Sequence, residues 1–327
     1  MVGYLVQLME EGRFEQCLRL AEQQLLHGGM TLSELATVNL VVCRCRLGLQ
    51  DVYGSINPGL LAAKLSRSTR DWDTYGRALL NVGTAYMGIR HYDRALRNLY
   101  MYFEHLSDYL TASRFEGAVW RSIGIAHQSL LQSDRAIRAL ERARQWYDDQ
   151  ESDRGSFGCI HDLLNVHLQV HEVNPKAGLD PALDLLLEEK AIVARHPDDS
   201  YYRSHYLLDR ASVYLHRACY GRARVSASQA RSARSDDMVL AFHSFMVLQR
   251  CSVQSGEAKE AIGYALAARV TAMQAKRHDL EALATQTIAD LMGSPEAPVP
   301  AELDKMYHTM EMDLDRYLPD TASRSLH

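Results

Sequence analysis

The chain has 327 residues, a formal net charge of −5, 47% hydrophobic residues and 24% charged residues. This composition supports a packed core and is too apolar for a disordered chain. Because no global basic field is present, neither nucleic acid nor an anionic membrane surface is expected as a partner of this chain alone.

The N-terminal segment and the cysteines indicate in which cellular compartment the protein is expected. MVGYLVQLMEEGRF turns acidic by Glu10 and has neither the basic start nor the small-residue cleavage site of a secretory signal. No apolar run approaches the ~20 residues that a membrane-spanning helix needs. Among the six cysteines only Cys43 and Cys45 are close, without the paired C-x-x-C spacing of a zinc site. We therefore expect a cytoplasmic protein whose cysteines are buried free thiols.

Proline placement indicates where helices run. An interior proline removes a helix hydrogen bond, and no proline lies between Pro58 and Pro175. That interval carries apolar residues at helical spacing, such as Leu79, Val82 and Tyr86. The pattern predicts paired helices, with the later prolines in connectors or first turns.

The sequence repeats within this proline-free interval. The segments VGTAYMGIRHYDRALRNLY from Val82 and IGIAHQSLLQSDRAIRALE from Ile123 align, with glycines at Gly83 and Gly124, 41 residues apart. The same step reaches Val42 in one direction and Asn165 in the other. A fixed period of this size predicts stacked helix pairs.

Small residues recur where the two helices of a pair would cross. Gly83 is followed by Ala95, and Gly124 by Ala136, in each case 12 residues on. We expect about eight pairs, the first beginning almost at Met1 and the last with helices near residues 279–293 and 301–315. The predicted repeat domain spans residues 1–316, and residues 317–327 form a C-terminal tail.

The residues from Val82 to Leu99, V-G-x-x-Y-x5-Y-x2-A-x3-L, resemble the tetratricopeptide repeat, and SVYLHRACYGRA from Ser212 to Ala223 is similar. The period exceeds the usual ~34 residues, which implies longer helices or loops. This variant resembles the peptide-sensing repeat domains of bacterial quorum-sensing regulators more than eukaryotic co-chaperones. The resemblance implies an all-α, right-handed α-solenoid.

The resemblance also implies that the first helix of each pair lines a concave surface that binds a ligand. Asn81 is the strongest candidate, because an amide both donates to and accepts from a peptide backbone. For each candidate the alternative is an ordinary solvated residue on a helix surface. The carboxylate clamp of the co-chaperones is absent, since Asn39, Cys43, Ala118 and Ser122 hold its places. The ligand-binding candidates are Arg77, Asn81, Thr84, Arg121, Gln128, Asp162, His205, His243 and Arg250.

Catalytic and metal motifs are missing from the sequence. There is no G-x-S-x-G, no phosphate-binding glycine loop and no evident carboxylate pair, so no catalytic residue and no cofactor are predicted. His167 and His171 are four residues apart, with His161 and Glu172 nearby. Without an H-E-x-x-H pattern, structural histidines are favoured over a metal site.

Two functions fit these observations, and nothing suggests an enzyme. The first is a regulatory or adaptor module that binds a peptide or protein segment. The alternative is a passive assembly scaffold that binds folded partners on its outer or terminal surfaces, and the terminal repeats are where a homodimer is expected. In the regulators that the chain resembles, an output domain precedes the repeats. Here the first repeat starts at once, so either the output is protein contact alone or the chain is the sensor portion of something larger.

Overall fold

The computed structural model describes residues 2–106 and 115–293. Within these residues the chain forms fifteen α-helices and a short 3-10 helix, and no strand. None of the described helices combines the length and the apolar character needed to cross a bilayer. The all-α expectation is confirmed.

The chain folds into two compact units, Met1–Val166 and His167–His327. The helices of the first unit are α1 (Val2–Glu10), α2 (Phe14–His27), α3 (Leu32–Gly48), α4 (Val52–Thr69), α5 (Trp72–Gly88), α6 (Tyr92–Leu106), α7 (Glu116–Ser129) and α8 (Ser133–Asp149). The boundary between the units falls within α9 (Asp153–Val173).

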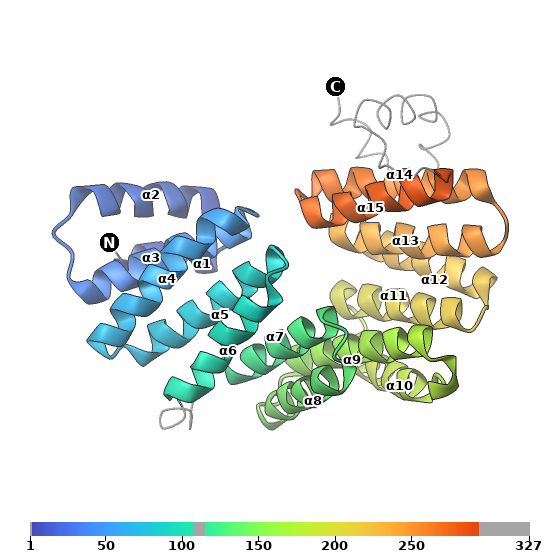
Figure 1. The fold of residues 1–327 in the computed structure, drawn as a ribbon, viewed down its shortest axis with the longest axis horizontal. Coiled ribbons are helices and arrows are strands. Elements are labelled where there is room, and N and C mark those ends of the chain that lie inside the picture. Colours follow the sequence, from blue (N-terminus) through green and yellow to red (C-terminus); the bar gives the residue numbers. More distant parts are fainter. Residues whose placement is uncertain (1, 107–114, 294–327) are drawn as a thin grey trace. The chain divides into compact units, whose positions relative to one another are not determined.

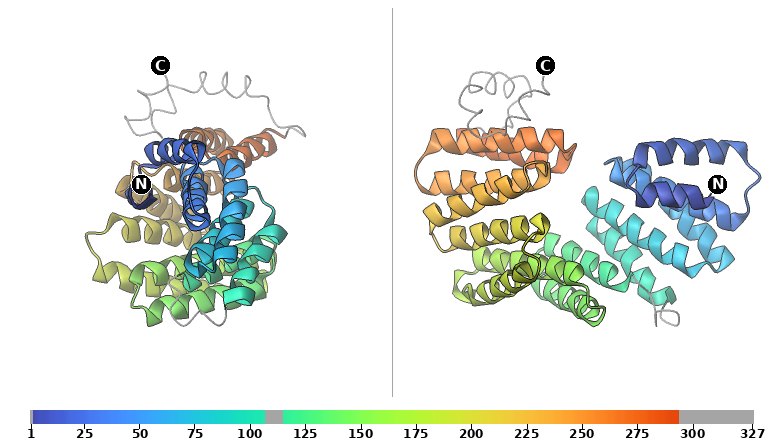
Figure 2. Two further views of the ribbon diagram at one scale, coloured as in Figure 1. Left: turned by 90° about the vertical axis from the view of Figure 1, so that its left-hand side faces the viewer. Right: turned by 180° about the vertical axis from the view of Figure 1, so that it is seen from behind.

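The second unit continues the same pattern. It contains the 3-10 helix Pro175–Ala177, followed by α10 (Asp180–Arg195), α11 (Ser200–His216), α12 (Tyr220–Ala233), α13 (Met238–Gln254), α14 (Ala258–Gln274) and α15 (His278–Met292). Figure 1 shows consecutive helices running in opposite directions, and the right-hand view of Figure 2 shows α11 to α15 layered one on another.

The helices follow the predicted repeat. In the described residues α1 to α14 make seven consecutive pairs, and α15 coincides with the first helix expected for the eighth. The second helix expected at 301–315 and the tail at 317–327 lie outside the described residues. The helical-repeat architecture is therefore confirmed over residues 2–106 and 115–293.

Glycines let the helices of a pair approach closely. A Cβ added to Gly83 would lie 2.7 Å from Leu99 Cδ2, and one added to Gly124 would lie 2.5 Å from Leu140 Cγ. Such distances are below van der Waals contact, so a larger residue at either position would require the facing leucine to move. The partner of each glycine is thus a leucine one turn beyond the alanine of the sequence pattern.

Pro58 is the one proline that interrupts a described helix, and its cost is offset locally. It lies inside α4, where it cannot donate a hydrogen bond to the carbonyl of Gly54. The guanidinium of Arg46 on α3 supplies the missing donor, with Nη1 2.9 Å from that carbonyl oxygen. The interaction also joins the two helices of this pair.

Candidate ligand-binding site

The first helices of four successive pairs surround a cavity in the first unit. Its volume is about 330 Å³, and we call it the first hollow. Residues from α1, α3, α5 and α7, together with the residue before α7, form its wall. They are Met9, Leu40, Arg44, Arg77, Leu80, Asn81, Thr84, Phe115, Ala118 and Ser122.

Three of the candidates from the sequence share this hollow. The carboxamide of Asn81 is half-buried and makes no hydrogen bond to any described residue. Arg77 holds its guanidinium 5.7 Å from the centre of the Phe115 ring and 4.0 Å from Asp73 Oδ2. Thr84 is exposed, and its hydroxyl donates to the carbonyl of Leu80 at 3.0 Å. The hollow therefore offers an unengaged amide beside a cation.

Two further candidates are engaged with each other. Arg121 on α7 and Asp162 on α9 are 41 residues apart, which is the repeat period, and Nε of the arginine lies 2.5 Å from Oδ2 of the aspartate. The Asp162 side chain is 12% exposed and that of Arg121 33%. Arg121 also packs against Gly158, where an added Cβ would lie 2.7 Å from Nη1. This pair therefore acts as a bridge between neighbouring first helices.

A second hollow lies in the second unit. It has a volume of about 260 Å³ and is lined by Leu215, His216, Ala218, Tyr220, Gln249, Arg250, Val253 and Gln254. The candidate Arg250 donates through Nη2 to Oε1 of Glu172, at the end of α9. Nε2 of His216 lies 3.0 Å from the same oxygen.

The electrostatics of Glu172 reflect these two partners. Partial burial works to raise the pKa of its carboxyl, but the hydrogen bond and charge of Arg250, together with His216, outweigh burial and hold the pKa below its usual range. Arg250 thus has a carboxylate partner on another helix of its own unit, whereas Arg77 of the first hollow has its carboxylate neighbour, Asp73, on its own helix.

The remaining candidates lie in neither hollow. His205 has Nδ1 2.9 Å from the carbonyl oxygen of Tyr201, and its ring lies 4.2 Å from the Tyr201 ring. His243 is exposed on α13, with its ring 5.2 Å from that of Phe242. Gln128 is half-buried on α7. A ligand role for these three, as for the other candidates, stays a prediction.

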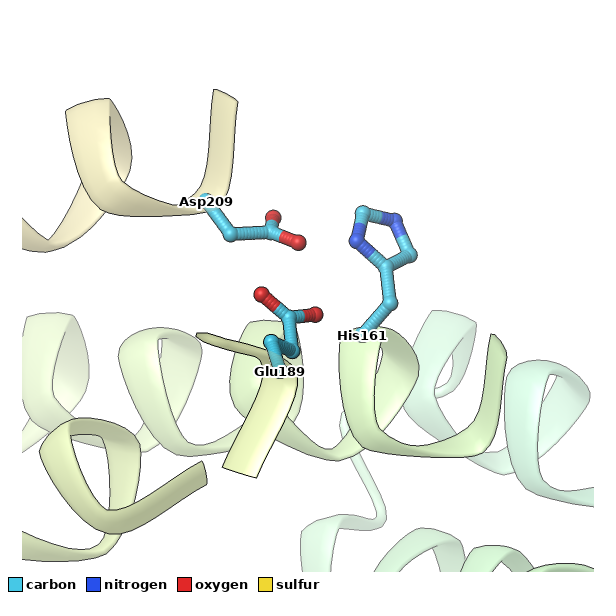
Figure 3. Close-up of side chains that lie close together, drawn as sticks. All are labelled: His161, Glu189 and Asp209. Carbon is cyan, nitrogen blue, oxygen red and sulfur yellow. The ribbon is translucent and has the colours of Figure 1, made fainter. Parts of the chain in front are cut away.

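The second unit contains a buried carboxylate pair that was not predicted from the sequence. Glu189 on α10 and Asp209 on α11 are 0% and 1% exposed, and Figure 3 shows their carboxylates directed toward one another. Burial, and next the negative charge of Asp209, raise the pKa of Glu189 well above its usual range. No motif marks this pair. However, Glu189 falls four residues after Leu185 and three before Ile192, both buried, and this helical phase signals a buried carboxylate.

Comparisons with known proteins identify the fold. No family model and no curated protein sequence matches the chain. Among solved structures, NprR in complex with its cognate peptide NprX aligns with a TM-score of 0.63 at 12% identity, over 97% of this chain and 94% of that chain. The apo form of the quorum sensor NprR from B. thuringiensis aligns with a TM-score of 0.60 at 11% identity, over 97% and 89%.

A Rap protein complexed with competence and sporulation factor gives a TM-score of 0.62 at 13% identity, over 99% of this chain and 90% of that chain. The chain has the tetratricopeptide-like fold of these quorum-sensing regulators. The resemblance read from Val82 to Leu99 is therefore confirmed at the level of the fold. At identities this low, the likeness does not extend to individual binding residues.

Proposed function

We propose that this chain is a regulatory module that binds a peptide or protein segment on the concave face formed by its first helices, with the first hollow as the point of attachment. One observation carries the proposal. Arg77, Asn81 and Thr84, chosen from the repeat register, line a single hollow in which the Asn81 amide is unengaged. The solved complexes of NprR with the peptide NprX and of a Rap protein with its factor support a peptide as the ligand class.

The wall of the first hollow suits a peptide chemically. The Asn81 carboxamide donates to a peptide carbonyl and accepts from the next peptide N–H. Arg77 and Arg44 favour a carboxylate, on a side chain or at a C-terminus. Met9, Leu40 and Phe115 supply the apolar surface that most ligand sites contain.

The same wall favours binding over catalysis. It contains no histidine, cysteine or carboxylate to act as a general base, and its two hydroxyls, on Thr84 and Ser122, donate to the carbonyls of Leu80 and Ala118. We infer that the chain acts through the contact it makes and not by transforming its ligand.

The test uses peptides enriched from a random library by panning on the full chain, with affinity measured by titration calorimetry. Asn81→Ala removes hydrogen bonds to a neutral backbone, so we expect affinity to fall by roughly two- to tenfold. Asn98→Ala is the matched control, because Asn98 on α6 is half-buried, as Asn81 is, and its side chain bonds only to the Arg94 carbonyl. Equal affinities for both variants would refute the assignment of the first hollow. Failure to enrich any peptide would favour the passive scaffold.

A further inference from the structure

A further cavity in the second unit has no place in the proposed function. It is a groove of about 810 Å³ along α11, flanked by the end of α10 on one side and by α12 on the other. We call it the α11 groove. Its lining residues are Val193, Ala194, Pro197, Arg203, Tyr206, Leu207, Arg210, Ser228, Gln229, Ser232 and Ala233.

This groove uses the opposite side of α11 from the candidates of the concave face. Two residues along an α-helix correspond to a rotation of about 200°. Arg203 is two residues before the candidate His205, and Arg210 is seven residues, or about two turns, after Arg203 and so lies on the same side as Arg203. The groove residues Arg203 and Arg210 therefore point away from the side on which His205 lies. A ligand in the groove would leave the proposed peptide site free.

The groove is cationic, although the chain as a whole is acidic. Arg203 is exposed, and its guanidinium has no hydrogen-bond or ion-pair partner among the described residues. Arg210 donates from Nε to Ser226 Oγ at 3.1 Å and from Nη2 to Gln229 Oε1 at 3.0 Å. Its guanidinium also lies 5.6 Å from the centre of the Tyr206 ring. Neutral acceptors thus hold Arg210 in place without cancelling its charge.

No carboxylate lines the α11 groove, and the α12 sequence YGRARVSASQARSA contains none. The acidic neighbour of Arg210 along α11, Asp209, is buried and faces Glu189. Asp199, one turn before Arg203, accepts from the backbone N–H of Tyr201. The two arginines have no ion-pair partner among the described residues and present positive charge to a ligand, while Val193, Pro197 and Leu207 present apolar surface beside it.

We propose that the α11 groove binds a short acidic segment of a partner protein. Arg203 and Arg210 are seven residues apart, or about 10 Å along the helix axis. A bound helix with carboxylates at positions i and i+7 has the same spacing. Apolar residues at i+3 and i+4 of that helix would contact Tyr206 and Leu207, in the manner of an amphipathic helix in a groove. Each arginine can form a charge-assisted bidentate pair with a carboxylate.

The walls favour a protein segment over a polyanion. Phosphate backbones are bound through arrays of cationic and polar donors, whereas aliphatic side chains and a proline make one wall of this groove. A segment with alternating acidic and apolar residues satisfies both the charge and the walls.

The experiment pans a random peptide library on the full chain, with counter-selection against the Arg203→Glu variant. We expect the enriched peptides to carry acidic residues about two helical turns apart with apolar residues between them. Fluorescence anisotropy of the best peptide should show a loss of at least ~10-fold in affinity for Arg203→Glu, because a hydrogen-bonded charge is removed. Asn81→Ala should not change this affinity, so the result is independent of the first hollow.

Lys276→Glu is the control for net charge, since Lys276 lies exposed between α14 and α15 and changes the charge by the same amount. Equal weakening by Lys276→Glu and Arg203→Glu would overturn the proposal in favour of general electrostatic attraction. So would the enrichment of neutral or basic peptides, or of none. Full displacement of the peptide by a single-stranded oligonucleotide, at an affinity that Arg203→Glu abolishes, would reassign the groove to polyanions.

Discussion

The first and second hollows are built from the same kind of helix but differ in what they leave available. In the first, the Asn81 amide has no described hydrogen-bond partner. In the second, Arg250 already binds the carboxylate of Glu172, which His216 also contacts. Candidates on the first helices therefore differ in whether another helix already supplies a partner for the side chain. We expect an engaged candidate such as Arg250 to be less available to a ligand than Asn81.

The largest expected effect comes from a variant that tests the close helix packing at Gly83. This packing underlies the repeat alignment from which the candidates in both hollows were chosen. Gly83→Leu would place side-chain atoms where Leu99 already lies 2.7 Å from the added Cβ. We expect a loss of roughly 1–3 kcal/mol in the free energy of unfolding, as overpacking usually costs. Urea denaturation followed by far-ultraviolet circular dichroism measures it.

Gly221→Ala provides the matched control for Gly83→Leu. Gly221 lies in α12, and nothing lies within 4 Å of an added Cβ there. The alanine should stabilise the helix by roughly 0.5–1 kcal/mol because its intrinsic propensity is higher. If Gly83→Leu were as harmless as Gly221→Ala, the packing of α5 on α6 described above would be wrong.

The second test concerns a candidate that proved to be engaged. Arg121→Ala leaves Asp162, whose side chain is 12% exposed, without its ion-pair partner. We expect a destabilisation of roughly 1–3 kcal/mol, the cost of leaving a largely buried polar group unsatisfied. The double variant Arg121→Ala/Asp162→Ala should lose less than the sum of the single losses. Strict additivity of the two losses in urea denaturation would show that the pair contributes no coupling.

Arg121 marks the limit of what the sequence could predict. The 41-residue step and the small residues at Gly83 and Gly124 were enough to place the helices, because repeat packing depends on local size and apolar period. They also grouped Arg77 with Asn81. The pattern did not predict the ion pair across the period. Arg121 and Asp162 were each expected to face the concave surface as ligand-binding residues, and only the packing of α7 beside α9 brings the two side chains together. The α11 groove arises from the spacing of three helices, which no residue pattern encodes.

The third test uses pH to probe the buried pair of the second unit. The pKa of Glu189 is raised, so the folded state keeps a proton that the unfolded chain releases near the ordinary glutamate pKa of ~4.3. Its contribution to stability is complete below that pH and is lost as the pH rises toward the raised pKa. We expect Glu189→Gln, which is neutral at every pH, to unfold at a higher temperature than the wild type at pH 7.5.

At pH 4 the same two proteins should have nearly equal unfolding temperatures, because Glu189 is then protonated in both the folded and the unfolded state. Glu188→Gln is the control, since Glu188 is the adjacent residue on α10 and is not fully buried. A gap between wild type and Glu189→Gln that does not vary with pH would contradict the raised pKa.

The smallest expected effect on stability bears most directly on the difference between the hollows. Glu172→Gln removes the charge that Arg250 and His216 share. The Glu172 side chain is 44% exposed, and exposed ion pairs contribute about 0–1 kcal/mol, so the free energy of unfolding should change little at pH 7. The pKa of Glu172 is lowered, so the contribution of its charge to stability is present above the ordinary glutamate pKa and is lost as the pH falls below it.

Because the expected effect on stability is small, the informative readout for Glu172→Gln is binding. With its guanidinium released, Arg250 should bind an acidic peptide more tightly, and calorimetry of a peptide enriched on the wild-type chain should then reveal a second, weaker site that Arg250→Ala abolishes. A single site of unchanged affinity in Glu172→Gln would show that the ion pair is not what closes the second hollow to ligands.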